Sequence, residues 1–431
     1  MSNATAIDRV MAWEALDSRG TPTVACEVRV AGGAVGTATV PSGASTGAHE
    51  ARELRDGGER YAGRGVQQAV SNVERILGPA VHGHDARDQA GLDATMRQLD
   101  GTPNLGRLGA NAILAVSIAT ARAAAAAANV PLHRYLAADG DPLLPMPMIN
   151  IVSGGAHAGG AVDVQDFLIV PVGAESFAQA IEWAWRVRRA TASVASERGL
   201  IAVLVADEGG LGPSLPSNRA ALELLASGIA RAGLQPGAEV AIAIDVAATQ
   251  FVQGNHYHLA AEDRTVDAAG LLEELAEWRA SYPIVSLEDP VGEDDWDGWR
   301  DASTRWATDL QLLGDDLFAT DLQRLERGID MGVANAVLVK PNQSGTLSGA
   351  KAVVIRAHEA GYATVVSARS GDTEDDWLAD LAVGWRAGQI KVGSLTRSER
   401  TAKWNRLLRI EKEAGGRAVF AGRAALGRRR T

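Results

Sequence analysis

The stretch Ile284-Val285-Ser286-Leu287-Glu288-Asp289-Pro290 is a short apolar run that ends in acidic side chains. Near-continuous apolar runs of this length are typical of buried strands in a parallel sheet covered by helices. Similar runs recur later in the chain, each ending in a polar or charged residue: 203–205 before Asp207 and Glu208, 240–244 before Asp245, 312–313 before Asp315, 336–339 before Lys340, 364–366 before Ser367-Ala368-Arg369, and 389–390 before Lys391.

The distances between these run ends fit one strand plus one helix. They are 43 residues from Asp245 to Glu288, then 27 to Asp315, 25 to Lys340, 29 to Arg369 and 22 to Lys391. Helix-like segments lie between the runs, for example at residues 271–282 and 350–360. Repeating strand–helix units over about 280 residues favour a barrel of the α/β class, with functional residues at the carboxyl ends of the strands.

The beginning of the 431-residue chain has a different pattern. Residues 6–40 are predicted to form strands around a turn at Arg19-Gly20-Thr21-Pro22, and residues 64–136 are predicted to be helical. Strands followed by helices indicate an α+β domain. The proline-rich segment 139–147 is the best linker candidate, so we predict an N-terminal α+β capping domain at 1–140 and a barrel at 141–431.

Three carboxylates, Asp245, Glu288 and Asp315, are predicted to face one cavity at the ends of neighbouring strands. Without a cation they would repel one another strongly, so they indicate a bound hard cation. Oxygen ligands without cysteine or paired histidine suit Mg²⁺ better than Zn²⁺. The alternative is that each carboxylate caps the helix that follows it.

Two lysines follow later apolar runs in the same way as the carboxylates. Lys340 ends the next strand, where neighbouring cations would push its ammonium toward the neutral form that acts as a base. Such a base can take a proton from a carbon next to a metal-bound carboxylate. Lys391 is predicted to bind a substrate carboxylate or phosphate. The alternative for both lysines is a strand end at the surface.

Composition excludes several classes of partner. Lys plus Arg total 42 against 53 Asp plus Glu, a net charge of −11, which disfavours nucleic acid and anionic membranes. The single cysteine, Cys26, excludes an intrachain disulfide, and residues 110–130 are interpreted as a buried helix rather than a membrane span. We expect a cytoplasmic protein, because no signal peptide is evident.

Several longer motifs extend this pattern over nearly the whole chain. They are Leu16-Asp17-Ser18-Arg19-Gly20, Val40-Pro41-Ser42-Gly43-Ala44-Ser45-Thr46-Gly47, Glu53-Leu54-Arg55-Asp56, Ser286-Leu287-Glu288-Asp289-Pro290, Gly314-Asp315-Asp316-Leu317, Lys340-Pro341-Asn342-Gln343, and Gln389-Ile390-Lys391 with Arg397-Ser398-Glu399-Arg400. With these motifs the chain closely resembles the enolase family. The resemblance implies a capping domain on a (β/α)₈-type TIM-like barrel, a homodimer or higher homo-oligomer, two Mg²⁺ ions, and a small phosphorylated carboxylate such as 2-phosphoglycerate or phosphoenolpyruvate as substrate.

The resemblance also implies roles for individual residues. Asp245, Glu288 and Asp315 would hold the first metal, and Ser45 the second together with the substrate phosphate. Lys340 would be the base at C-2, and Glu208 would help expel the C-3 hydroxyl. His157 would contact the substrate beside Glu208. Arg369 and Ser370 would hold the phosphate and Lys391 the carboxylate.

Two positions depart from the family pattern. The family has Ser-His-Arg-Ser-Gly where this chain has Ser367-Ala368-Arg369-Ser370-Gly371, so a titratable imidazole and its volume are missing. The family has Gln-Glu-Phe where this chain has Gln165-Asp166-Phe167. The acid at Asp166, expected to be catalytic, is shorter by one methylene, and acid–base catalysis needs hydrogen-bond contact.

These departures favour a specialised function. The leading interpretation is a Mg²⁺-dependent enzyme that abstracts the C-2 proton of 2-phosphoglycerate or a phosphono analogue through an enediolate, such as carboxyphosphonoenolpyruvate synthase of phosphinothricin-type antibiotic biosynthesis. The first alternative is an ordinary phosphopyruvate hydratase of glycolysis. The others are a catalytically weak binding or moonlighting protein and a scaffold role.

Overall fold

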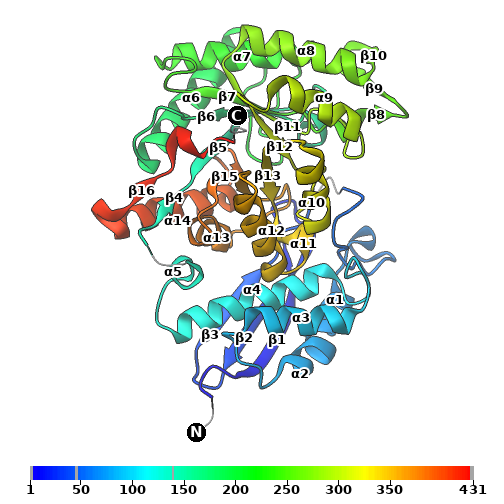
Figure 1. Ribbon diagram of the computed structural model, residues 1–431, viewed down its shortest axis with the longest axis vertical. Helices are drawn as coiled ribbons and strands as arrows, with labels where there is room; N and C mark the ends of the chain where they lie inside the picture. The colour runs from blue at the N-terminus through cyan, green and yellow to red at the C-terminus, as the bar shows by residue number, and fades with distance from the viewer. Residues whose placement is uncertain (1–2, 44–46, 138–139, 428–431) are drawn as a thin grey trace.

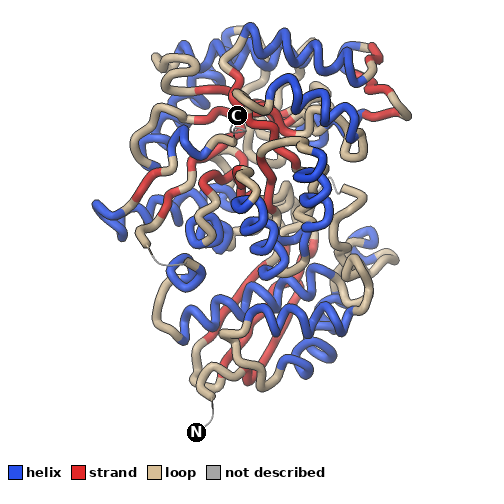
Figure 2. The backbone as a smooth tube through the Cα atoms, viewed as in Figure 1, coloured by secondary structure: helices blue, strands red, loops and turns tan. Residues whose placement is uncertain are grey.

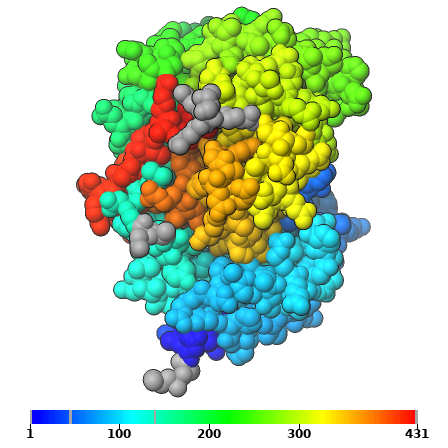
Figure 3. Space-filling model, viewed as in Figure 1, coloured from blue at the N-terminus to red at the C-terminus, as the bar shows by residue number. Residues whose placement is uncertain are grey.

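The computed structural model describes residues 3–43, 47–137 and 140–427. The N-terminal elements lie below the barrel in Figure 1, and the space-filling view shows them packed directly against it (Figure 3).

The N-terminal part begins with an antiparallel sheet in the order β1-β2-β3. Its strands are β1 (Ile7–Leu16), β2 (Pro22–Val30) and β3 (Val35–Thr39), and its helices are α1 (Gln67–Asn72), α2 (Gly78–Val81), α3 (Gln89–Asp100), α4 (Ala110–Ala127) and α5 (Leu132–Leu136). The alanine-rich α4 crosses this sheet (Figure 1). By length and composition α4 could cross a membrane, but 83% of it is buried inside the protein, so the expected buried helix is observed.

Eight strands of the described chain close into a barrel in the order β11-β12-β13-β14-β15-β5-β6-β7. They are β5 (Met146–Ser153), β6 (Asp166–Val170), β7 (Ala241–Asp245), β11 (Ile284–Glu288), β12 (Gln311–Gly314), β13 (Ala336–Val339), β14 (Ala363–Ser367) and β15 (Gly388–Gly393). Strand β6 runs antiparallel to both of its neighbours, and the other pairs are parallel. Alternate residues such as Met146 and Met148 form an apolar cluster, as expected for a filled barrel.

Helices cover the outside of the barrel (Figures 1 and 2). They are α6 (Phe177–Glu197), α7 (Asn218–Arg231), α8 (Ala268–Ser281), α9 (Trp296–Trp306), α10 (Leu322–Met331), α11 (Pro341–Ser344), α12 (Leu347–Glu359), α13 (Trp377–Gly384) and α14 (Ser398–Ala414). Small strands complete the fold: β4 (Leu143–Leu144) pairs with β16 (Val419–Phe420), and β8 (Val252–Gln253), β9 (His256–Leu259) and β10 (Arg264–Val266) form a separate sheet. The predicted α+β part followed by an α/β barrel is therefore confirmed.

Three local expectations are wrong. The apolar run 203–205 is not a buried strand but a loop, in which Val203 is 87% exposed. The linker candidate 139–147 already contains β4 and the start of β5, although Asp139 lies outside the described residues. Strands β5 and β6 have no counterpart among the predicted runs. Apolar content alone does not distinguish an exposed loop from a buried strand.

Candidate active site

The residues that end the barrel strands lie together at one end of the barrel. Asp245 ends β7 and Glu288 ends β11, and these two residues pair directly in the parallel register. Asp315 follows β12, Lys340 follows β13 and Lys391 lies within β15. The three carboxylates and Lys391 are buried.

Lysine ammonium groups lie directly against these carboxylates. Lys391 Nζ lies 2.7 Å from Asp245 Oδ2 and 2.8 Å from both Glu288 carboxylate oxygens, and Lys340 Nζ donates to Asp315 Oδ2. Burial by itself would lower the pKa of each lysine, but the facing carboxylates outweigh it, and both pKa values are raised. Burial and the negative charge of Asp245 raise the pKa of Glu288. Arg369 and Lys391 do lower the pKa of Lys340, as expected of neighbouring cations, but the contact with Asp315 outweighs them.

Polar side chains that sequence reasoning did not single out hold the carboxylates in place. Asp289 has a positive φ of 41°, and its carboxylate accepts hydrogen bonds from the backbone N–H groups of Asp315 and Asp316. Gln343 Nε2 donates to Asp315 Oδ1 at 2.9 Å, and Gln165 Nε2 donates to Asp245 Oδ2 at 2.9 Å. Such partners orient ligating carboxylates.

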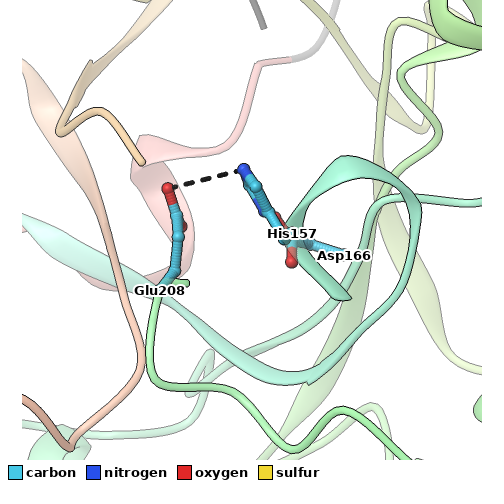
Figure 4. Close-up of side chains that lie close together, drawn as sticks. All are labelled: His157, Asp166 and Glu208. Carbon is cyan, nitrogen blue, oxygen red and sulfur yellow. Dashed lines mark hydrogen bonds and ion pairs between the residues drawn. The ribbon is translucent and has the colours of Figure 1, made fainter. Parts of the chain in front are cut away.

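A second group of side chains adjoins the carboxylates and lysines. His157 lies in the short 3₁₀ helix Gly155–Ala158, and Glu208 lies in the loop after the exposed run. His157 Nε2 is 3.9 Å from Glu208 Oε1, and His157 Nδ1 is 2.9 Å from Asp166 Oδ2 (Figure 4). Arg400 Nη1 is 3.8 Å from the same Glu208 oxygen. All four side chains are buried.

The predicted anion-binding residues lie on the adjoining wall. The guanidinium of Arg369 makes two hydrogen bonds to Glu50, of 2.8 and 3.2 Å, and these contacts raise the pKa of Arg369 despite its burial. The carbonyl oxygen of Ser370 accepts from Arg400 Nη2 at 2.6 Å. Ser45 lies outside the described residues. Glu50, which the sequence interpretation missed, therefore competes with a ligand for Arg369.

One small cavity joins most of the predicted site residues. Its lining is His157, Gln165, Glu208, Asp245, Lys340, Ser367, Ala368, Arg369, Ser370 and Lys391. Ala368 is thus part of the wall, as expected, but the cavity measures only about 20 Å³. Among the described residues this cavity leaves no larger void beside Ala368, and the lysine and arginine side chains of the site are paired with carboxylates.

The scarcity of lysine is a clue that the sequence interpretation did not use. The chain has five lysines, at positions 340, 351, 391, 403 and 412, among 42 basic residues. Lys403, like Lys391, is buried, and its ammonium lies 2.6 Å from Asp372 Oδ1. Most other basic residues of the chain are arginines. A buried lysine therefore indicates a position that needs a compact ammonium or a group able to lose its proton.

Comparisons with known proteins agree with this geometry. The family model "Enolase, N-terminal domain" matches residues 7–136, and "Enolase, C-terminal TIM barrel domain" matches residues 141–428. An enolase from Acidothermus cellulolyticus is 52% identical over 422 residues, which cover 98% of this chain and 98% of that protein. The chain therefore belongs to the enolase family and is a carbon–oxygen lyase of that family.

Proposed function

We propose that this protein is a Mg²⁺-dependent lyase that removes water from 2-phosphoglycerate to give phosphoenolpyruvate, the phosphopyruvate hydratase reaction of glycolysis. One observation carries the proposal. Asp245, Lys340, Lys391, His157 and Glu208 line one cavity, and the carboxylates of Glu288 and Asp315 contact the ammonium groups of these two lysines. A base and a leaving-group acid that line the same small cavity suit such a β-elimination.

The carboxylates fit a magnesium ion. Asp245, Glu288 and Asp315 supply an oxygen-only donor set, which Mg²⁺ prefers. The ammonium groups of Lys391, which is buried, and Lys340, which is partly buried, already lie against these oxygens, so positive charge is favoured there. When bound, Mg²⁺ supplies charge that neutralises the carboxylates and stabilises negative charge that develops on the substrate. Two ions per site, the second bound with help from Ser45, remain part of the proposal.

Different residues of the chain then carry out the separate steps of the reaction. Lys340, once it is released from Asp315 and its ammonium has given a proton to solvent, takes the proton from C-2 at Nζ. The electron pair left at C-2 forms the double bond to C-3, and the C-3 oxygen leaves as water after it receives a proton from Glu208. Arg369 and Ser370 bind the phosphate and Lys391 the carboxylate, so Arg369 must exchange Glu50 for the ligand.

Purified protein with Mg²⁺ and 2-phosphoglycerate tests this proposal. We expect the ultraviolet absorbance of the enol product, and no product from Lys340→Ala. Exchange of the C-2 hydrogen for deuterium should also disappear in that variant. A protein that neither exchanges C-2 hydrogen nor forms product would refute the proposal and would favour a binding or moonlighting role.

One feature favours a second candidate. Ala368 lines the cavity beside Arg369 where the family motif has histidine, so a substituent on the phosphorus atom of the substrate would meet a methyl group rather than an imidazole. This supports a phosphono analogue of 2-phosphoglycerate as substrate, as in carboxyphosphonoenolpyruvate synthase of antibiotic biosynthesis. Poor turnover of 2-phosphoglycerate together with efficient turnover of the phosphono analogue would identify this candidate.

A self-association surface is also part of the proposal. The loop after α6 exposes a continuous apolar run, with Ile201 62%, Val203 87% and Leu204 63% exposed. Exposed apolar patches of this kind mark contact surfaces, and a second copy of the chain is the partner we propose, in a homodimer or higher oligomer. Leu204→Asp should then lower the molar mass measured by light scattering. We further propose a cytoplasmic location and a domain division at 140/141.

A further inference from the structure

His157 lies between two carboxylates on opposite edges of its ring. Asp166 Oδ2 is 2.9 Å from Nδ1, and Glu208 Oε1 is 3.9 Å from Nε2 (Figure 4). A donor atom from each of the three residues lies within 4.8 Å of the others, which is close enough for a shared metal ion. However, the two ring nitrogens point in divergent directions, and each faces its own carboxylate. The arrangement is therefore that of an imidazole that bridges two acids.

Both carboxylate oxygens of Asp166 are occupied inside the protein. Oδ2 faces His157, and Oδ1 accepts a hydrogen bond from Asn150 Nδ2, which also donates to Ser153 Oγ at 2.8 Å. Asp166 and Asn150 are completely buried. Asp166 lies on β6 between Ser153 of β5 and Asp245 of β7, so its backbone is fixed on both sides.

Asp166 is also separated from the reaction cavity. Among the described residues that line this cavity, His157 and Glu208 are present but Asp166 is not. A side chain with one more methylene would reach beyond the ring nitrogen, whereas the aspartate ends at it. The short acid therefore contacts the histidine instead of a ligand.

We propose that Asp166 is a positioning residue: it holds His157 by Nδ1, so that Nε2 faces Glu208 and the reaction cavity. The inference rests on the proposed function and assigns the groups beside the departing C-3 oxygen to His157 and Glu208. The hydrogen bond to Asp166 fixes which nitrogen faces the cavity, the role a carboxylate partner commonly has for a functional histidine.

Charge supports the same arrangement. Burial by itself lowers the pKa of His157, but Asp166 and Glu208 outweigh it and raise the pKa to about 9. Charge therefore favours the protonated ring, with Nδ1 facing Asp166 and Nε2 facing Glu208. A third carboxylate, that of Asp245, acts in the same sense.

Three substitutions at one position test the inference. Asp166→Asn keeps an oxygen that can accept from Nδ1–H but removes the charge, Asp166→Ala removes both, and Asp166→Glu restores the family residue. The matched control is Asp380→Asn, because Asp380 Oδ1 lies 3.1 Å from Nδ1 of His133 in a second buried histidine–aspartate pair outside the cavity.

The first readout is independent of activity. Nitrogen-15 NMR of the full-length protein labelled at its eight histidines, without substrate, reports the protonation of each ring, and His157→Gln assigns the signal. We expect Asp166→Ala to change the His157 Nδ1 signal and Asp380→Asn to leave it unchanged. An unchanged His157 signal in Asp166→Ala would overturn the inference, even if the protein catalyses no reaction.

The second readout separates leaving-group chemistry from C-2 chemistry. With 2-phosphoglycerate and Mg²⁺, Asp166→Ala should lower kcat about 100-fold with little change in KM, since a misplacement of about 1 Å has this effect. Deuterium exchange at C-2 should persist in Asp166→Ala. The kcat of Asp166→Asn should be at least tenfold higher than that of Asp166→Ala. Equal losses of exchange and turnover, or no recovery in Asp166→Asn, would contradict a positioning role. Absence of both activities in the unmodified protein would instead refute the proposed function and leave the NMR result to decide the positioning role.

Discussion

Replacing Lys391 by methionine should destabilise the protein in a way that Mg²⁺ specifically reverses. Lys391 Nζ makes contacts of 2.7 Å to Asp245 and 2.8 Å to both oxygens of Glu288, and all three side chains are buried. At an effective dielectric constant of about 20, each charge pair at this distance is worth about 6 kcal/mol before desolvation is subtracted. Removing one partner of such a buried pair costs about 3–5 kcal/mol.

A divalent cation can replace the lost ammonium. A ligand at about 100 times its dissociation constant stabilises the folded state by about 2.7 kcal/mol. In Lys391→Met the cation no longer competes with the lysine for Asp245 and Glu288. We therefore expect Mg²⁺ to stabilise the variant by at least about 1.4 kcal/mol more than the unmodified protein, which corresponds to a tenfold tighter apparent affinity.

Urea denaturation with and without Mg²⁺ measures both quantities. Lys403→Met is the matched control, because Lys403 is equally buried and its ammonium lies 2.6 Å from Asp372, outside the carboxylate group. It should lose stability to a similar extent but gain nothing extra from Mg²⁺. If both variants respond equally to Mg²⁺, or if neither does, the assignment of Asp245, Glu288 and Asp315 as the metal site is wrong.

Three further perturbations have defined outcomes. Ala368→His should raise kcat/KM for 2-phosphoglycerate if the missing imidazole diverts the specificity, and equal turnover of the phosphono analogue before and after the change would contradict this. Burial alone raises the pKa of Asp380, but its arginine and histidine partners lower it to about 2. The resulting contribution of about 2 kcal/mol to the free energy of unfolding is present above pH 3.8 and is lost as the pH falls through about 2. Asp380→Asn should therefore flatten the acid dependence of unfolding in that range. Gly36→Ala should cost about 1–3 kcal/mol in urea denaturation, because its Cβ would lie 2.2 Å from the carbonyl oxygen of Ala119, whereas Gly416→Ala, with open space around it, is the control.

The barrel and its functional edge could be predicted from local pattern alone. In a parallel barrel the carboxyl ends of the strands meet at one edge, so acids and lysines that end successive apolar runs must come together. Asp245 and Glu288 illustrate this, since they are aligned in the register of β7 and β11. The resemblance to the enolase family, confirmed by the comparisons, added roles that no spacing specifies.

The wrong expectations concern segments whose apolar content does not show whether they are buried or exposed. Residues 203–205 have the composition of a buried strand but form an exposed loop, and the barrel strand between β5 and β7 is β6, which runs antiparallel to both. A short apolar run carries no information about which strand pairs with it.

The sequence by itself determined the residue types at the strand ends, and hence the charges available to the site. Only the tertiary structure decided which charges meet. Lys391 reaches Asp245 across 146 residues, a contact that exists only once the barrel has closed, and Arg369 reaches Glu50 across 319, a contact that also needs the N-terminal part packed against the barrel. The contact of Asp166 with His157 spans only nine residues, but it too forms between segments that the pairing of β5 with β6 brings together. Contact distances of this kind depend on the packing of whole elements, which local sequence does not encode.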